Sequence, residues 1–270
     1  MTRPERLDRA VIRVSGPDAV SFLNNLLTQD IWKGSVQYAA LLSPQGKVIA
    51  DLFVWHGDYG AVIECDPSRG AELLRRLTMY KLRAQVVIED AGAEFAVLVS
   101  ADVFDGANGD PRLHAFGWRK LAPANEAHGP SGWYEAQRMA SGVPDLARDA
   151  APEEVFAGEA LLDELNGVDF GKGCFVGQEN VSRMKRRATT RKKFCPVVFE
   201  GDAIAFGTPV LAGDAEIGSV RTGVAGRAIA LLRLDRALEA AAAGKALTAA
   251  GREIRLDPPD WLILPQREQD

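Results

Sequence analysis

Hydrophobic and polar positions follow a mixed pattern along the first hundred residues. Residues 10–14 form an apolar run that predicts a strand, and apolar positions between residues 20 and 27 then recur at helical spacing. Ser15 precedes that helix where an N-cap residue would stand. Three apolar runs within residues 37–65, separated by the turn sequences PQGK and HGDYG, predict an antiparallel meander.

The pattern continues with an amphipathic helix predicted over residues 67–81 and strands predicted over residues 84–90 and 94–100. Strands and helices mix without a regular alternation, which favours an α+β fold. Residues 102–130 are polar and rich in Gly, Pro and Asn, apart from a short run at residues 112–121, so we expect a boundary region or long surface loops there.

The second half of the chain changes character. Helices are predicted over residues 133–141 and 156–165, the second closed by Asn166-Gly167, with a polar stretch between them. After Lys193 the pattern becomes short strands punctuated by glycine, which favours a small β-barrel or sandwich with one short helix at residues 235–245.

Composition narrows the class of protein. A length of 270 residues with 47% hydrophobic and 26% charged positions suggests two or three globular domains. The sequence holds no apolar run of the ~18 residues that a membrane span needs, and its start lacks an apolar signal region, so we expect a cytoplasmic protein without a membrane partner. The net charge of −5 argues against nucleic acid as the main ligand.

The stretch KGCFVGQE, residues 172–179, carries the candidate chemistry. If Gly177 or Gln178 opens a helix running to about residue 187, Cys174 lies just outside its N-terminus, where amide groups and the helix dipole favour a thiolate. Lys172 adds positive charge, and Glu179 opposes it. The alternative is that Cys174 is a small buried hydrophobe. Cys65 and Cys195 resemble ordinary strand residues, and three scattered cysteines make neither a disulfide framework nor a zinc site.

A basic run follows, with seven Lys or Arg among residues 183–193. It is either a solvated helix end, an RNA contact, or a dock for a polyanionic small molecule. No aromatic residue is interleaved for base stacking, which weakens the RNA reading.

The segment KGCFVGQENVSR closely resembles the signature of the folate-binding YgfZ family, which includes the mitochondrial iron–sulfur assembly factor of the same descent. VIRVSGPDAVSFLNNLLTQDI, LLSPQGKVIADLFV, DPRLHAFGWR and RMASGVP resemble further family segments. The resemblance implies an α+β ring of three small domains shared with glycine-cleavage T-protein: residues 1–92, residues 93–190 ending in the KGCFVGQE loop and helix, and a C-terminal β-barrel over residues 191–270.

The resemblance also implies a function and a site. The protein would bind tetrahydrofolate or a one-carbon derivative in a central hole and support assembly or repair of iron–sulfur clusters in client enzymes, including a radical-type tRNA-modifying one. A cluster would be held only transiently, by Cys174 with assembly factors or clients as partners, and no metal site of its own is expected. Cys174 and Asp51 would be the reactive groups. The cofactor contacts would be Asp51, Arg138, Lys172, Gln178, Glu179 and Arg183, with Lys185, Arg186 or Lys192 near a glutamate tail.

Two rival functions stay open, and whether the protein turns over a substrate is one of the open points. A tetrahydrofolate-dependent aminomethyltransferase is disfavoured because Ala50 and Ala140 stand where T-proteins carry carboxylates. A non-catalytic tRNA-binding module would use the basic run. Asp51 could instead be a buried hydrogen-bond acceptor, and Arg138 could form an interdomain ion pair.

Overall fold

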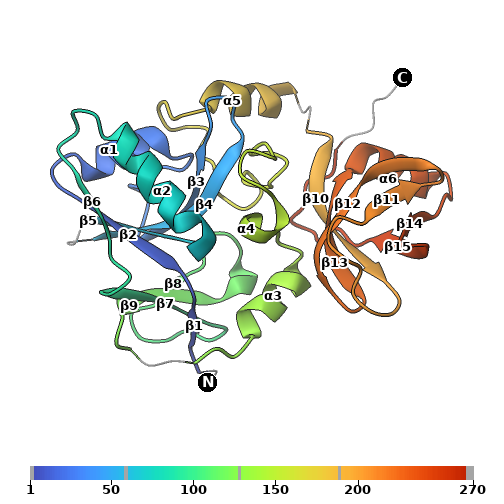
Figure 1. Cartoon of the computed structure of the whole chain (residues 1–270), viewed down its shortest axis with the longest axis horizontal. Helices are drawn as coiled ribbons and strands as arrows, with labels where there is room; N and C mark the ends of the chain where they lie inside the picture. Colours follow the sequence, from blue (N-terminus) through green and yellow to red (C-terminus); the bar gives the residue numbers. More distant parts are fainter. Residues whose placement is uncertain (1–2, 58–59, 127–128, 188–189, 266–270) are drawn as a thin grey trace.

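The computed structural model describes residues 3–57, 60–126, 129–187 and 190–265, which form two open sheets and a closed barrel (Figure 1). The first sheet is antiparallel with the order β3-β4-β5-β2-β6. Its strands are β2 (Ala10–Ser15), β3 (Val36–Leu42), β4 (Val48–Gly57), β5 (Gly60–Cys65) and β6 (Val87–Asp90). Helices α1 (Ala19–Leu26) and α2 (Pro67–Tyr80) pack on it through a buried apolar cluster. The predicted meander is confirmed in β3, β4 and β5.

The entry into α1 differs from the prediction. The chain turns at Gly16 with φ +110°, and a Cβ there would lie 2.3 Å from the carbonyl oxygen of Gln85. The helix therefore starts only at Ala19, and Ser15 is the last residue of β2 rather than its N-cap. Asp18 holds the N-cap position, but its carboxylate accepts a hydrogen bond from the Gln85 amide at 2.7 Å instead of capping the helix.

The second sheet has the order β1-β7-β9-β8. Its strands are β1 (Glu5–Leu7), β7 (Phe95–Ser100), β8 (Asn108–Gly109) and β9 (Trp118–Pro123), accompanied by the 3-10 helix η1 (His114–Phe116) and by α3 (Trp133–Ser141). Because β9 pairs along the whole length of β7, the segment expected as a boundary region is part of a sheet. Strand β1 comes from the first predicted domain and pairs with β7.

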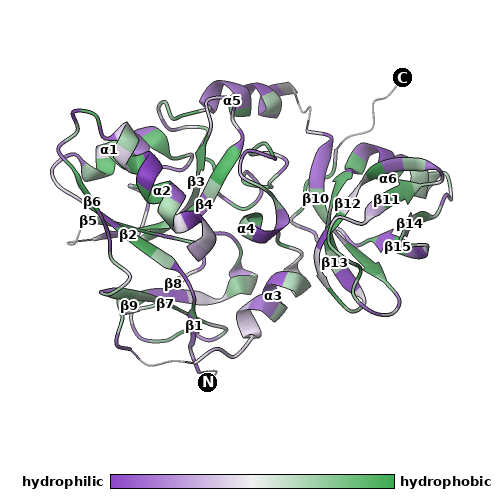
Figure 2. Cartoon of the chain, viewed as in Figure 1, coloured by the Kyte–Doolittle hydropathy of each residue, from purple (hydrophilic) through white to green (hydrophobic). Residues whose placement is uncertain are grey.

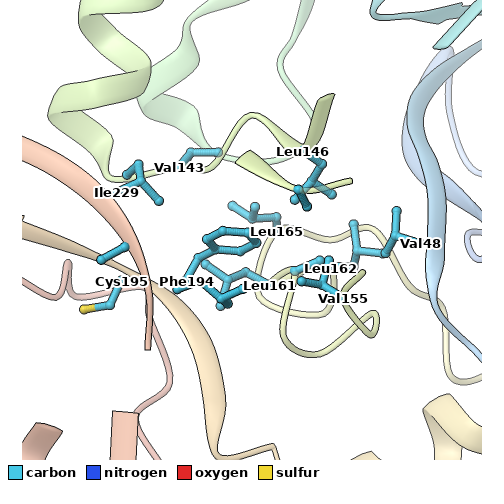
Figure 3. Close-up of a cluster of buried hydrophobic side chains, with 14 of the residues drawn as sticks. Val48, Val143, Leu146, Val155, Leu161, Leu162, Leu165, Phe194, Cys195 and Ile229 are labelled. Carbon is cyan, nitrogen blue, oxygen red and sulfur yellow. The ribbon is translucent and has the colours of Figure 1, made fainter. Parts of the chain in front are cut away.

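The connection between the second sheet and the barrel is mostly turns. Helix α4 (Leu146–Asp149) lies where a polar stretch was expected, and the helix predicted over residues 156–165 is absent. Leu161 has φ +62°, a left-handed conformation that ends α-helical geometry. The apolar spacing instead reflects turns that bury Leu161, Leu162 and Leu165 against Val48, Leu146 and Phe194 (Figure 3).

Helix α5 (Gln178–Arg187) leads into the C-terminal barrel, which closes in the order β10-β13-β12-β11-β14-β15. Its strands are β10 (Lys192–Phe199), β11 (Pro209–Ala212), β12 (Ala215–Val224), β13 (Arg227–Arg233), β14 (Leu247–Ala249) and β15 (Arg252–Leu256), with α6 (Leu234–Ala242) between β13 and β14. The predicted α+β class and C-terminal barrel are confirmed. Among the helices described, none combines the length and apolar character needed to cross a bilayer.

Candidate functional site

Cys174 lies in the loop that precedes α5, and its side chain is exposed. Cys65 in β5 and Cys195 in β10 are buried, and burial raises the pKa of each of these two thiols to about 12. The three cysteines therefore differ in kind, since only Cys174 is placed to meet another molecule. Helix α5 starts four residues later, at Gln178, and ends at Arg187, so the helix expected after this loop is confirmed.

Lys172 holds the cysteine loop against the end of α1. Its ammonium donates to the carbonyl oxygens of Asn24 and Leu27, both at 2.7 Å, and to that of Gln29 at 2.9 Å. Cations at a helix C-terminus satisfy its last carbonyls and complement the dipole. Burial lowers the pKa of Lys172 to about 8. The structure thus gives Lys172 a positioning role that the sequence did not suggest.

Gly177 lets the start of α5 approach the turn between β3 and β4. Its φ is +82°, and a Cβ there would lie 2.6 Å from the carbonyl oxygen of Ser43 and 3.0 Å from Cα of Gly46. Asn180 in the first turns of α5 donates to the carbonyl of Gln45 at 2.7 Å. The positive φ and the close approach both require glycine at position 177. Gly173 has no neighbour within 4 Å of its virtual Cβ and needs no such freedom.

Asp51 sits on β4 and accepts a hydrogen bond from the hydroxyl of Tyr38 at 3.0 Å. Burial raises the pKa of its carboxyl group, and Arg9 and Arg112 oppose that shift. The space that Asp51 lines with Arg69 and neighbouring apolar residues measures about 10 Å³, room for about one water molecule. A pterin ring does not fit there in this arrangement, so tetrahydrofolate binding stays a prediction.

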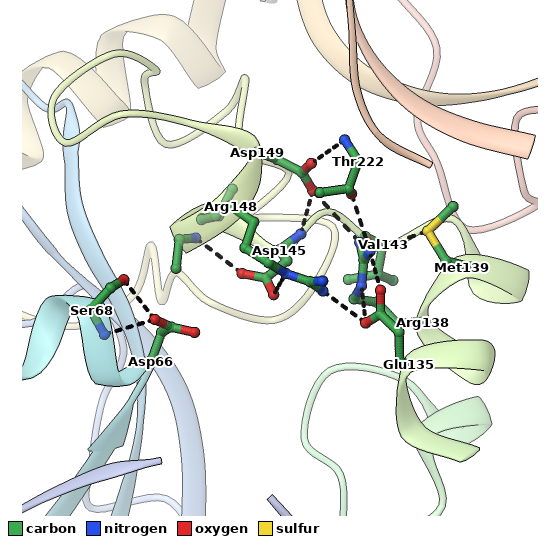
Figure 4. Close-up of polar contacts among 12 residues, drawn as sticks. Asp66, Ser68, Glu135, Arg138, Met139, Val143, Asp145, Arg148, Asp149 and Thr222 are labelled. Atoms are coloured by element: carbon green, nitrogen blue, oxygen red, sulfur yellow. Dashed lines mark hydrogen bonds and ion pairs between the residues drawn. The ribbon is translucent and has the colours of Figure 1, made fainter. Parts of the chain in front are cut away.

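Arg138 lies in α3 and is 3% exposed. Its guanidinium donates to Glu135, to the carbonyl of Val143 and to the hydroxyl of Thr222 in the barrel, and it lies 3.6 Å from the Asp149 carboxylate (Figure 4). Its ion-pair partners, Glu135 and Asp149, belong to the same predicted domain as Arg138, and its link to the barrel is the hydrogen bond to Thr222 rather than the interdomain ion pair named as the alternative. A folate contact by Arg138 stays a prediction.

The basic side chains of α5 divide into two groups. Lys185 pairs with Asp163 at 2.9 Å and lies over the ring of Phe170. Arg183 and Arg186 are exposed, and their hydrogen bonds go to Asn180 and to the carbonyl of Ser182 within the same helix. In the part of the chain that the structure describes, neither of these two arginines pairs with a carboxylate.

A pocket of about 260 Å³ lies beneath α5, and sequence reasoning missed it. We call it the α5 pocket; it is lined by Ala157, Gly158, Asp163, Val168, Phe170, Val181, Met184, Lys185, Thr190, Lys193, Ile263, Leu264 and Pro265. The spacing of Val181 and Met184 on one helix face was a signal for it. The contribution of the C-terminal segment has no comparable signal, because it comes from about 80 residues further along the chain.

The expected site residues form one group and two separate positions. Two of them lie in the loop before α5, Lys172 and Cys174, and three lie in α5 itself, Gln178, Glu179 and Arg183. The backbone of Gly46 contacts Gly177, and Asp51 follows Gly46 by five residues. Asp51 therefore lies at most about 18 Å from Gly46. Arg138 belongs to the joint with the barrel. The loop with Cys174 is therefore the candidate site. Asp51 lies on β4 of the β3–β4 hairpin, whose turn contacts the start of α5.

Comparisons with known proteins agree with this architecture. Residues 191–263 match the family model "CAF17, C-terminal beta-barrel domain". The chain is 31% identical over 300 residues to the human protein "Iron-sulfur cluster assembly factor IBA57, mitochondrial", covering 95% of this chain and 84% of that protein. The mouse protein of the same name is 32% identical, with 85% and 77% covered.

A fungal homologue of the same name from Phaeosphaeria nodorum is 29% identical, covering 74% of this chain. The chain spans only 56% of the length of that relative. Among solved structures, glycine cleavage system aminomethyltransferase T from Bartonella henselae matches with a TM-score of 0.73 at 14% identity, covering 98% of this chain and 86% of that one. The expected T-protein-like fold is confirmed.

These comparisons overturn the expected cytoplasmic location. The relatives named here are all described as mitochondrial proteins, which points to the mitochondrion instead. The sequence argument for the cytoplasm rested on the absence of a signal region, and composition alone does not identify a compartment.

The human and mouse relatives exceed 30% identity over most of their own length, and the barrel matches independently. The chain therefore belongs to the IBA57 family, whose C-terminal domain is the CAF17 β-barrel.

Proposed function

We propose that the protein supports the assembly of iron–sulfur clusters and that Cys174 is the side chain that contacts the cluster. The observation that carries the proposal is the exposure of Cys174, a thiol in the loop before α5 in a chain whose other two cysteines are buried. The family supports the kind of cargo, since its named members are iron–sulfur cluster assembly factors.

The proposed chemistry is exchange of ligands on iron. The Cys174 thiol loses its proton to solvent as its sulfur bonds to iron, and a thiolate of the donor leaves that iron. A thiolate of the client later displaces Cys174 in the same way, so no electron changes hands.

The cluster is cargo in this scheme rather than a resident group. Iron–sulfur clusters are commonly held by four cysteine thiolates. Cys65 and Cys195 are buried in different sheets, and the described residues hold no group of three His, Cys, Asp or Glu side chains arranged for a metal ion. The remaining ligands must therefore come from a donor, a client or a small thiol, which makes such proteins the partners.

The finer expectations from the sequence resemblance are part of the proposal. YgfZ-type tetrahydrofolate binding is supported by the T-protein-like fold and by the buried carboxyl group of Asp51. Tetrahydrofolate binding requires the space around Asp51 to become larger, because it now has room for about one water molecule. Calorimetric titration of the purified protein with tetrahydrofolate tests this binding. Asp51→Asn should lower the measured affinity. If tRNA-modifying enzymes are among the clients, cells that lack the chain should lose the corresponding tRNA modification.

The aminomethyltransferase alternative has less support. The match to aminomethyltransferase T is at 14% identity and concerns the fold alone. Asp51 supplies one carboxyl group, but Ala50 and Ala140 stand at the other positions where the T-protein pattern has one. A tRNA-binding module rests on the basic run alone.

Complementation in cells tests the proposed function. Cells lacking the chain receive the wild type, Cys174→Ala, Cys174→Ser or a control, Cys195→Ala, at matched protein levels. We expect both Cys174 variants to lose the activity of an iron–sulfur dehydratase relative to a cluster-free enzyme, because neither side chain supplies a thiolate. Full activity with Cys174→Ala would contradict the proposal.

A further inference from the structure

The α5 pocket opens beside the loop that carries Cys174. Val168 and Phe170 of that loop form one wall, and Val181 and Met184 of α5 form another. Phe170 is 42% exposed, and Ile263, which also lines the pocket, is 58% exposed. Exposed apolar side chains gathered around one hollow are typical of a protein contact.

The size of the pocket favours a side chain as its occupant. Its volume of about 260 Å³ is below the ~300 Å³ at which pockets for drug-sized molecules begin. The two cations at its walls already have partners: Lys185 pairs with Asp163, and Lys193 pairs with Glu164 and donates to the carbonyl of Ile263. A mostly apolar hollow whose cations are paired within the chain suits one inserted apolar side chain.

The outer face of α5 adds positive charge next to this hollow. The helix has one acidic residue, Glu179, and four basic ones, in a chain of net charge −5. Figure 2 shows α5 as mostly hydrophilic. Arg183 and Arg186 are exposed and pair with no carboxylate among the described residues. Their positive charges can therefore attract an acidic surface of a partner, which would raise the association rate and orient the partner.

We propose that the α5 pocket and the outer face of α5 form a docking surface for an acidic protein segment that places one apolar side chain in the pocket. The inference rests on the proposed function, because this surface would hold a partner beside Cys174. Nucleic acid is the poorer candidate, because the lining of the pocket is mostly apolar and helix α5 has no aromatic ring for a base to stack on.

Binding of designed peptides to the full chain tests the surface. One fluorescent peptide carries a phenylalanine between two runs of glutamate, a second has alanine in place of the phenylalanine, and a single-stranded RNA has the same net charge. Fluorescence anisotropy gives the affinities. Burial of the ring should make the phenylalanine peptide bind about tenfold more tightly than the alanine peptide.

Paired variants locate the interaction. Arg183→Ser combined with Arg186→Ser should weaken the phenylalanine peptide about tenfold, whereas Lys245→Ser with Arg255→Ser, two exposed cations of the barrel, should change it less than about twofold. Cys174→Ala should bind like the wild type, so a failure of docking and a failure of the Cys174 chemistry remain distinguishable. Equal affinity for the two peptides, equal losses in both double variants, or tighter binding of the RNA would overturn the proposal.

Discussion

At the scale of single residues, the site depends on an exposed sulfur and on the groups that hold its loop. Cys174 itself is exposed, whereas Lys172, two residues earlier, has three carbonyl partners at and just after the end of α1. The sequence placed Lys172 near the thiol as a source of charge. The structure shows that its ammonium anchors the loop.

Replacing Lys172 by methionine tests this anchor. The carbonyls of Asn24, Leu27 and Gln29 would lose a charged donor, so we expect the free energy of unfolding to fall by about 1–3 kcal/mol. Lys33→Met is the matched control, because Lys33 is 64% exposed and pairs with Asp169 of the same loop; an exposed pair contributes less than about 1 kcal/mol. Urea unfolding of both variants measures the difference, and equal losses would refute the anchoring role.

At the scale of elements, the sequence predicted α2, α3, α5, the meander and the barrel strands, because each has a clear local period or turn signal. It failed at residues 156–165, where buried leucines in successive turns imitate a helical period. It also missed β1 pairing with β7 and the contact of α5 with the β3–β4 turn. These last features join distant segments, and a local pattern carries no information about them.

The contact between α5 and the β3–β4 turn yields a prediction for Gly177. Alanine there would combine a positive φ with a Cβ 2.6 Å from the carbonyl oxygen of Ser43. We expect a loss of about 1–3 kcal/mol in the free energy of unfolding. Gly173→Ala, four residues away with open space around it, should cost much less. Thermal unfolding compares the two, and a Gly177→Ala protein as stable as Gly173→Ala would rule out the close approach.

At the scale of the whole molecule, the barrel is joined to the two sheets by an apolar cluster and a polar one. The turns of residues 156–165 fill the space between β4 and the barrel (Figure 3). Arg138 and Asp149 connect α3 and α4 to Thr222 of β12 (Figure 4). The sequence predicted the barrel as a unit, but it did not predict these contacts between the barrel and the two sheets.

Arg138→Met tests the polar joint. It would leave the fully buried Asp149 without its cation, at a cost of about 3–5 kcal/mol in the free energy of unfolding. Arg148→Met removes a half-exposed arginine of the same cluster and should cost less than about 1 kcal/mol. Chemical denaturation distinguishes them; similar losses would show that the joint does not depend on Arg138.

The pair Asp163 and Glu164 predicts a pH dependence. Burial, followed by the neighbouring Asp163, raises the pKa of Glu164 to about 7 from its ordinary value of 4.5. Between these two values the folded chain binds a proton that the unfolded chain has lost, so the contribution of Glu164 to stability falls as pH rises. Glu164→Gln should flatten this fall between about pH 5 and 7. Unfolding midpoints across that range measure it, and an unchanged slope would contradict the assignment.

The central claim, that the Cys174 sulfur meets the cluster, is tested most directly by alkylation of that thiol. Cys65 and Cys195 are buried, so iodoacetamide should label the folded protein at Cys174, with mass spectrometry reporting the rate. Addition of a glutathione-bound iron–sulfur cluster should slow the labelling at least about fivefold, and a chelator should restore it. An alkylation rate that the cluster leaves unchanged would contradict the account.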